Sequence, residues 1–177
     1  MKGCSTERDG IMRGRRPMSD PLELQVGSAL RGKGWTLALG ESCTGGLVAH
    51  RITEVAGSSE YFLGGVVAYS NPVKYGLLQV AEQTLEQHGA VSEETALQMA
   101  RGARQVLGAD VGLSVTGIAG PGGGTAEKPV GLTVLAVSTP AGDWTERHIW
   151  SGDRQSNKQA SAEAALQLLL HALTDRS

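Results

Sequence analysis

The sequence predicts an α/β protein, a three-layer α/β/α sandwich around a mixed sheet. Short apolar segments of strand length alternate with helical segments along most of the chain, which is typical of strands covered by helices on both faces. Two glycine-rich loops, at residues 40–46 and 117–124, each follow a predicted strand. Near the C-terminus, two strands are joined by the turn Pro140-Ala141-Gly142-Asp143, which indicates an antiparallel hairpin and therefore a mixed sheet.

The composition describes one globular domain. The chain has 177 residues, 40% hydrophobic and 19% charged, with a formal net charge of −2, and this length suffices for one core. We expect no nucleic-acid or membrane partner, because such partners usually require a basic excess and no apolar run could span a bilayer. Two cysteines and four scattered histidines show no metal-ligand spacing. So few cysteines favour a reducing, cytoplasmic location.

The first half of the chain divides into a tail and alternating elements. Residues 1–19 are polar and lack hydrophobic periodicity, so we expect a disordered N-terminal extension there and a folded domain over 20–177. Asp20-Pro21 predicts the start of a helix that ends at Gly32 or Gly34. The next predicted elements are a strand over 35–39, a helix over 47–52, a strand over 66–70 and a helical turn that begins at 71–72.

The second half begins with helices and ends with the hairpin. Ser92-Glu93-Glu94-Thr95 is typical of a helix start, and Gly108 of the end of that helix after Leu107. The other predicted elements are a short helix over 82–87, strands over 110–116, 130–138 and 145–150, and a last helix capped by 151–153. Ligands gather at strand ends in open α/β sheets, so both glycine-rich loops could face one cleft.

The loop Gly40-Glu41-Ser42-Cys43-Thr44-Gly45-Gly46 lies where a strand turns into a helix. Such a junction offers free backbone N–H groups and the positive end of a helix dipole, which suit a bound phosphate or a developing oxyanion. Ser42 is either a helix N-cap or a nucleophile whose oxyanion the N–H groups of residues 44–46 would bind. Cys43 is a rival nucleophile, intrinsically the better one. The order of residues differs from the Gly-x-Ser-x-Gly nucleophile elbow.

A nucleophilic serine requires a general base. No histidine stands in a recognisable loop beside a carboxylate, so a Ser-His-Asp triad has weak support; the four are His50, His88, His148 and His171. Lys74 follows a predicted strand end and lies near the polar run Tyr69-Ser70-Asn71. A desolvated lysine can lose its proton near neutral pH and act as a base. A surface lysine on a helical turn is the alternative interpretation.

The second glycine-rich loop, residues 117–124, is either an anion-binding loop or a flexible connection between strands. It lacks the Gly-Lys-Ser/Thr ending of a P-loop and leads to a strand, which argues against a nucleotide triphosphatase. Thr116, at the preceding strand end, could hydrogen-bond a ligand. Arg154, at the start of the last helix, could bind a phosphate or simply be an exposed arginine.

Taken together, these motifs resemble the CinA C-terminal domain family, the nicotinamide-nucleotide amidases. The resemblance runs from about Leu22 to Leu173 in family order. The motifs that carry it are Glu41-Ser42-Cys43-Thr44-Gly45-Gly46, Gly57-Ser58-Ser59, Tyr61 to Asn71 with Lys74, His88 to Ser92, Val115 to Gly124, Lys128-Pro129-Val130-Gly131 and Gly152-Asp153-Arg154. Each motif alone is weak, whereas the series is specific.

The resemblance implies hydrolysis of the carboxamide of nicotinamide mononucleotide to nicotinate mononucleotide and ammonia, in pyridine-nucleotide salvage. It implies Ser42 as nucleophile, Lys74 as base, Tyr69 near the reacting groups, no metal or organic cofactor, and a homo-oligomer, a dimer or higher. The substrate-binding residues expected are Thr44, Gly45, Gly46, Asn71, Thr116, Gly117, Gly120, Gly122 and Arg154. We expect Gly45 and Gly46 to serve the amide oxyanion, and the loop 117–124 to face the rest of the nucleotide.

Two departures and two alternatives accompany this resemblance. Pro72 stands where relatives often carry a polar residue, and Lys158 where they commonly carry arginine, which affects any bidentate phosphate contact. We expect the stand-alone form of the family, without the pyrophosphatase-like domain of longer members. A non-catalytic nucleotide-binding or competence-associated regulatory module is the first alternative, and an amidase for another substrate is the second.

Overall fold

The structure, a computed structural model, describes residues 20–175, so the extension predicted for residues 1–19 lies outside the described residues. The helices are α1 (Leu22–Lys33), α2 (Leu47–Thr53), α3 (Asn71–Leu78), α4 (Glu82–His88), α5 (Glu93–Leu107) and α6 (Arg154–Thr174), with a short 3-10 helix at Ser58–Glu60. The strands are β1 (Leu37–Glu41), β2 (Phe62–Val67), β3 (Val111–Gly117), β4 (Leu132–Thr139) and β5 (Gly142–Ile149).

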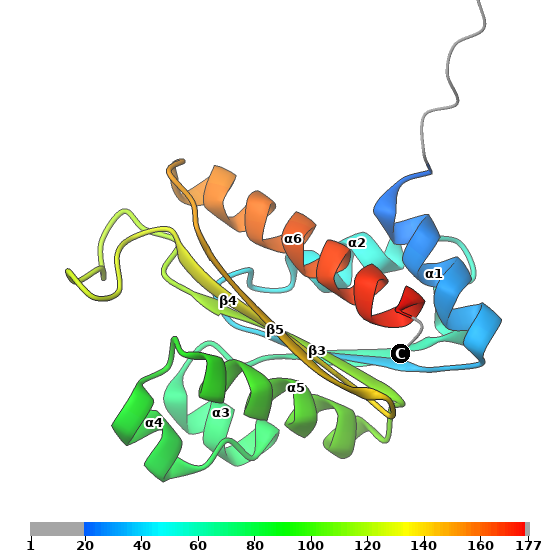
Figure 1. Cartoon of the computed structure of the whole chain (residues 1–177), viewed down its shortest axis with the longest axis horizontal. Helices are drawn as coiled ribbons and strands as arrows, with labels where there is room; N and C mark the ends of the chain where they lie inside the picture. Colours follow the sequence, from blue (N-terminus) through cyan, green and yellow to red (C-terminus); the bar gives the residue numbers. More distant parts are fainter. Residues whose placement is uncertain (1–19, 176–177) are drawn as a thin grey trace, which may run out of the picture.

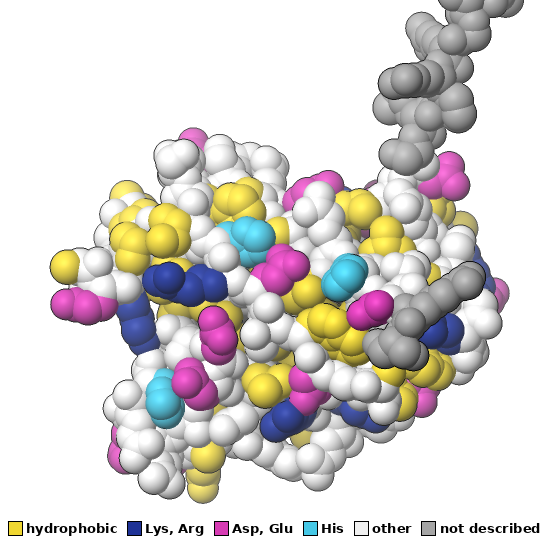
Figure 2. Space-filling view, in the orientation of Figure 1, with side chains coloured by type: hydrophobic (Ala, Val, Ile, Leu, Met, Phe, Trp, Pro, Cys, Tyr) yellow, Lys and Arg dark blue, Asp and Glu magenta, His cyan; other side chains and the backbone are white. Residues whose placement is uncertain are grey.

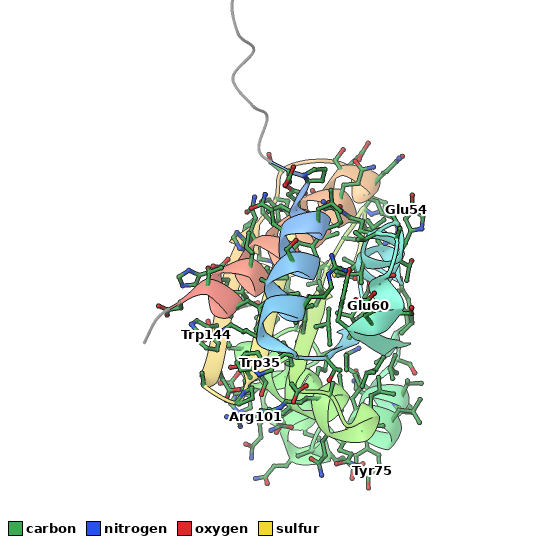
Figure 3. The ribbon with its side chains drawn as sticks, turned by 90° about the vertical axis from the view of Figure 1, so that its right-hand side faces the viewer. Trp35, Glu54, Glu60, Tyr75, Arg101 and Trp144 are labelled. Carbon is green, nitrogen blue, oxygen red and sulfur yellow. The ribbon has the colours of Figure 1, made fainter. Side chains whose placement is uncertain are left out.

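The five strands form one mixed sheet in the order β2-β1-β3-β4-β5. β1 runs parallel to both β2 and β3, whereas β4 pairs antiparallel with β3 and β5. Helices α1, α2 and α6 cover one face, and α3, α4 and α5 cover the other (Figure 1). The side view shows the same layers, with Tyr75 of α3 and Glu54 after α2 at opposite ends (Figure 3). The predicted three-layer fold with a mixed sheet is confirmed.

Alternating strand residues build the two halves of the core. The larger cluster lies between the sheet and helices α1, α2 and α6, and its strand members are Leu37, Leu39, Val111, Leu113, Val115, Leu135 and Val137. Ala38 lies in the opposite cluster with Leu78 and Met99. This two-residue period is the pleat of a sheet that is buried on both faces. Glu41 has the same parity as Leu39, so it faces the layer that contains α2.

Several strand bounds differ from the prediction. β5 begins at Gly142, three residues before the predicted start and inside the predicted turn. β1 extends through Gly40 and Glu41 instead of ending at residue 39, because these residues pair with β2 on one side and β3 on the other. β2 begins at Phe62, four residues before the predicted start, and includes Gly64 and Gly65. Glycine and glutamate are poor strand formers, so tertiary pairing decides these boundaries against local propensity.

The surface of the described residues carries both signs of charge. The face in Figure 2 intersperses acidic, basic and hydrophobic side chains without a broad region of one sign. Within residues 20–175, no helix has the length and apolar character that crossing a bilayer would need.

Candidate active site

Ser42 lies at the edge of the sheet where parallel strands end. β1 ends at Glu41, its neighbour β3 ends at Gly117, and the Ser42 N–H donates to Val115 O at 2.8 Å. Parallel strands present their carboxyl ends to the same edge. The structure therefore brings together the two glycine-rich loops, which lie far apart in the sequence.

Lys74 contacts Ser42 from the first turn of α3. The helix begins at Asn71 with Pro72 in its first turn, and side chains there point back towards the helix N-terminus. The Lys74 Nζ lies 3.1 Å from Ser42 Oγ and donates to Ala68 O at 2.8 Å. The residue is only 1% exposed. Burial lowers the pKa of Lys74, and the smaller effect of Cys43 acts in the opposite direction. This environment favours the neutral amine that a general base requires.

Cys43 and the histidines do not show the features of a nucleophile and its base. Burial raises the pKa of the Cys43 thiol to about 11, which leaves the thiol protonated at neutral pH. His50, His88 and His148 each lie near a carboxylate (Glu54, Glu94 and Glu146 respectively), but none of the three lines the cavity beside Ser42. The described residues therefore supply Ser42 with a lysine and not with a histidine.

A cavity of about 270 Å³ opens beside the Ser42–Lys74 pair. It gathers nine of the predicted site residues: Ser42, Tyr69, Asn71, Lys74, Thr116, Gly117, Gly120, Gly122 and Arg154. The Thr116 hydroxyl already has a partner, because its Oγ1 donates to Ala90 O at 2.7 Å. Ala90 and Val91 also line the cavity, as part of the His88 to Ser92 motif.

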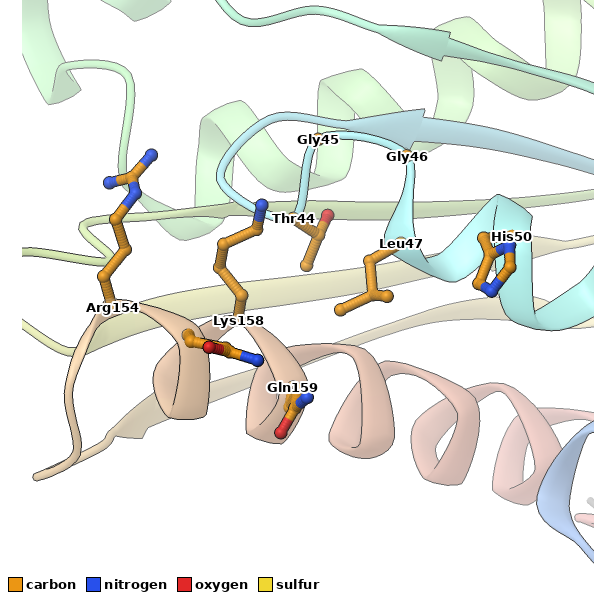
Figure 4. Close-up of a pocket in the computed structure, with 9 residues that line it drawn as sticks. Thr44, Gly45, Gly46, Leu47, His50, Arg154, Lys158 and Gln159 are labelled. Atoms are coloured by element: carbon orange, nitrogen blue, oxygen red, sulfur yellow. The ribbon is translucent and has the colours of Figure 1, made fainter.

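Arg154 lines both this cavity and a second one of about 580 Å³. Its guanidinium donates to Gly120 O at 2.8 Å and to Tyr69 Oη at 2.9 Å. The Lys158 side chain rises from α6 towards the turn at Thr44 and Gly45 (Figure 4).

The second cavity holds the three remaining predicted residues, which are Thr44, Gly45 and Gly46. They line it together with His50, Lys158 and others. Among the described residues, its lining includes arginine and lysine but neither aspartate nor glutamate. The second cavity therefore suits an anion.

The N–H groups of Gly45 and Gly46 are already bonded within the protein. The Gly45 N–H donates to Ser42 O at 3.1 Å, and the Gly46 N–H donates to Glu41 Oε2 at 3.0 Å. The expectation that these two groups serve the oxyanion is therefore wrong for this structure. No oxygen among the described residues accepts from the N–H groups of Cys43 and Thr44; the acceptor within their reach is the Cys43 sulfur, which is a weak one.

Sequence reasoning missed the roles of Glu41 and Asn157 in holding the site together. Glu41 accepts hydrogen bonds from the turn and from the start of α2. Asn157 Nδ2 donates to Ala119 O at 3.1 Å, and its Oδ1 accepts from Gly152 N at 3.0 Å, so it ties the glycine-rich loop to α6. Asn157 could have been found in the sequence as a polar residue on the apolar side of a helix. For Glu41 the only indication is its position next to Ser42 in the motif.

The polar groups of the smaller cavity are not those of a metal centre. Within residues 20–175, no three side chains of His, Cys, Asp or Glu gather closely enough to hold a metal ion. The hydrogen-bonding groups that line this cavity belong to serine, cysteine, threonine, lysine, tyrosine, asparagine, arginine and the backbone. Such groups suit the binding of a polar or anionic organic molecule.

Comparisons with known sequences agree on one family. Residues 19–173 match the model of the CinA C-terminal domain. The nicotinamide-nucleotide amidohydrolase PncC of Enterobacter agglomerans is 49% identical over 150 residues, which cover 84% of this chain and 92% of that protein. The CinA-like protein of Desulfotalea psychrophila is 52% identical over 150 residues, which cover 85% of this chain. The chain spans only 36% of the length of that relative.

Solved structures share the fold. The competence damage-inducible protein A of Klebsiella pneumoniae is 34% identical with a TM-score of 0.84, covering 88% of this chain and 97% of that one. The competence/damage inducible protein CihA of Agrobacterium tumefaciens is 42% identical with a TM-score of 0.81, covering 87% of this chain and 94% of that one.

Proposed function

The chain belongs to the CinA C-terminal domain family, and we propose that it is a nicotinamide-nucleotide amidase that converts nicotinamide mononucleotide to nicotinate mononucleotide and ammonia. The observation that carries this proposal is the 3.1 Å contact between Lys74 Nζ and Ser42 Oγ in a buried site. A serine beside a desolvated amine is an apparatus for acyl transfer. The relative in Enterobacter agglomerans, named as such an amidohydrolase, supports the choice of substrate.

The first half of the reaction forms an acyl-enzyme. Neutral Lys74 takes the proton of Ser42 Oγ as that oxygen attacks the carboxamide carbon, giving a tetrahedral intermediate with an oxyanion. The N–H groups of Cys43 and Thr44, which have no oxygen acceptor among the described residues, would bind that oxyanion. Lys74 then gives its proton to the amide nitrogen, the C–N bond breaks, and ammonia leaves.

The second half hydrolyses the ester. A water molecule takes the place of ammonia, Lys74 accepts its proton, and the resulting hydroxide attacks the acyl carbon. When the intermediate collapses, Ser42 Oγ recovers the proton from Lys74, and the nicotinic acid group that forms gives its remaining proton to solvent and leaves as nicotinate. Lys74 therefore acts twice as a base and twice as an acid, which requires a pKa near the working pH.

The two cavities suggest how the nucleotide lies. The smaller cavity beside Ser42 would hold the pyridine ring with its carboxamide, against the loop 117–124 and Asn71. The ribose phosphate would cross Arg154 into the larger cavity, where Arg154 and Lys158 provide positive charge. The Tyr69 hydroxyl accepts a hydrogen bond from Arg154. Tyr69 would therefore connect the phosphate-binding part of the site with the reacting groups.

The decisive experiment is an ammonia-release assay on nicotinamide mononucleotide without added metal. Wild-type protein should release ammonia, and Ser42→Ala should lose several orders of magnitude in kcat while keeping its circular dichroism spectrum. Lys74→Arg should be inactive too, because arginine stays protonated near neutral pH. Full activity of Ser42→Ala would overturn the nucleophile assignment, and a wild-type protein that binds the nucleotide without releasing ammonia would favour a binding module.

A further inference from the structure

Glu41 accepts three backbone hydrogen bonds from the chain that follows the nucleophile. Its Oε2 accepts from the N–H groups of Gly46 at 3.0 Å and Val48 at 3.2 Å, and its Oε1 accepts from Ala49 at 2.8 Å. Glu41 is 2% exposed and is the last residue of β1. One side chain therefore fastens the end of the central strand to the start of α2.

The hydrogen bonds that Glu41 accepts close the turn that contains Ser42. The hydrogen bond from Gly46 to Glu41 spans this turn, and the Gly45 N–H closes a smaller loop onto Ser42 O at 3.1 Å. Gly45 and Gly46 both adopt positive φ, at 64° and 98°, which lets the chain bend so tightly. Both glycine N–H groups donate to oxygen acceptors, whereas those of Cys43 and Thr44 have only the weakly accepting Cys43 sulfur within reach, so a ligand oxygen could take them over.

We propose that Glu41 is a positioning residue for the amidase reaction: by holding the backbone of Gly46, Val48 and Ala49, it fixes the Ser42 turn and directs oxyanion binding to the N–H groups of Cys43 and Thr44. This inference rests on the proposed function. The carboxylate engages the N–H groups of Gly46, Val48 and Ala49, so the donors without an oxygen acceptor are those next to Ser42, where the oxyanion forms. An error of about 1 Å in such a constellation costs roughly 100-fold in rate.

A purely structural carboxylate would stabilise the protein without affecting the chemistry, and the chain offers a matched control. Asp110 Oδ2 accepts from Thr36 N and Thr36 Oγ1, both at 2.8 Å. Thr36 directly precedes β1, at the end of the strand opposite to Glu41. Asp110→Asn and Glu41→Gln each replace a hydrogen-bonded carboxylate beside β1 with an amide of the same size. Only the second change touches the Ser42 turn.

The test measures kcat and KM with nicotinamide mononucleotide, per active site counted by labelling with a serine-reactive fluorophosphonate. Glu41→Gln should lower kcat roughly 10- to 100-fold with KM changed less than about three-fold, and slow Ser42 labelling in parallel. Asp110→Asn should lower the Tm but keep kcat and the labelling rate. A folded Glu41→Gln protein with wild-type kcat and labelling would overturn the proposal.

Two further measurements keep the proposal testable if Glu41→Gln does not fold. Glu41→Asp keeps the charge but draws the carboxylate back by one methylene, and its kcat should also fall; an unchanged kcat would refute the proposal. In the wild-type protein, the amide hydrogen of Gly46 should exchange with solvent more slowly than that of Thr44. Equal exchange rates would contradict the role of the hydrogen bond from Gly46 to Glu41. If the wild type labels at Ser42 but releases no ammonia, the proposed function fails while the labelling rates still decide the role of Glu41.

Discussion

Lys74 combines a favourable position for chemistry with an unfavourable one for stability. Its amine is buried against Ser42 and Ala68, and no carboxylate contacts it among the described residues. Burial lowers its pKa, so the folded protein binds the lysine proton more weakly than the unfolded chain does. Folding stability should therefore be lower wherever the unfolded chain keeps that proton, which includes neutral pH.

We therefore expect Lys74→Met to abolish turnover and yet stabilise the protein, by about 1 kcal/mol near neutral pH. The wild type gains stability as pH rises from the lowered pKa of Lys74 to the ordinary lysine value of about 10.4, because the unfolded chain binds more protons in that window. The advantage of the variant should shrink across the same window. Urea unfolding at several pH values measures this, and a less stable Lys74→Met at pH 7 would contradict it.

Arg154 and Lys158 should contribute to binding the phosphate of the substrate and not to the reaction of its carboxamide. Arg154→Lys and Lys158→Met should each raise KM for nicotinamide mononucleotide roughly 10-fold, since a hydrogen bond to a charged group contributes about 1.5–3 kcal/mol. For nicotinamide riboside, which lacks the phosphate, the Lys158→Met protein should match the wild type. Steady-state kinetics with both substrates provide the measurement. An equal effect of Lys158→Met on both substrates would place the phosphate elsewhere.

Helices α3 and α5 pack so closely that glycine is required where they meet. A Cβ on Gly102 of α5 would lie 1.8 Å from the backbone oxygen of Leu78, whereas a Cβ on Gly32 of α1 would meet nothing within 4 Å. We expect Gly102→Ala to lower the free energy of unfolding by about 2 kcal/mol or more, because backbone must move. Gly32→Ala should raise it by about 0.5–1 kcal/mol. Thermal unfolding of both variants checks the contrast.

The sequence predicts helices well here and strands less well, for a physical reason. A helix such as α5 carries its own start and stop signals, Ser92 and Gly108, and both cap it in the structure. β2 depends on partners far away in the chain: Gly64 and Gly65 have no strand preference, and only pairing with Ala38 and Leu39 makes them extended. Local composition could not reveal that pairing.

The candidate site shows the same limit. Ser42 and Lys74 could be suspected from their local surroundings, but their contact is made across 32 residues, by the parallel pairing of β1 and β2 and the turn into α3. The free N–H groups expected at residues 44–46 follow from the helix start alone. That reasoning was wrong for Gly46, because the side chain of Glu41 reaches its N–H group and no sequence rule specifies the rotamer of that side chain.

At the scale of the molecule, the core is closed by the first and last helices lying against one another. Val26 and Leu30 of α1 are fully buried in the larger cluster, which also contains residues of α6 such as Leu169. α1 and α6 lie over the same face of the sheet (Figure 1). Arg154 and Lys158 of α6 line the second cavity. The folding unit therefore has to include α1, and the family match begins at residue 19, shortly before it.

We accordingly expect residues 20–177 alone to keep the Tm and kcat of the full chain. Removing residues 1–33 takes away α1 and exposes its partners in the core. Each buried leucine or valine contributes about 1.5–3 kcal/mol to the free energy of unfolding. The shorter chain should therefore not fold cooperatively. Calorimetry and the ammonia assay on the three chains distinguish these cases. A chain of residues 20–177 that folds with wild-type Tm but has lost kcat would mean that residues 1–19 take part in the site, and a chain of residues 34–177 that unfolds cooperatively would mean that the larger core cluster does not need α1.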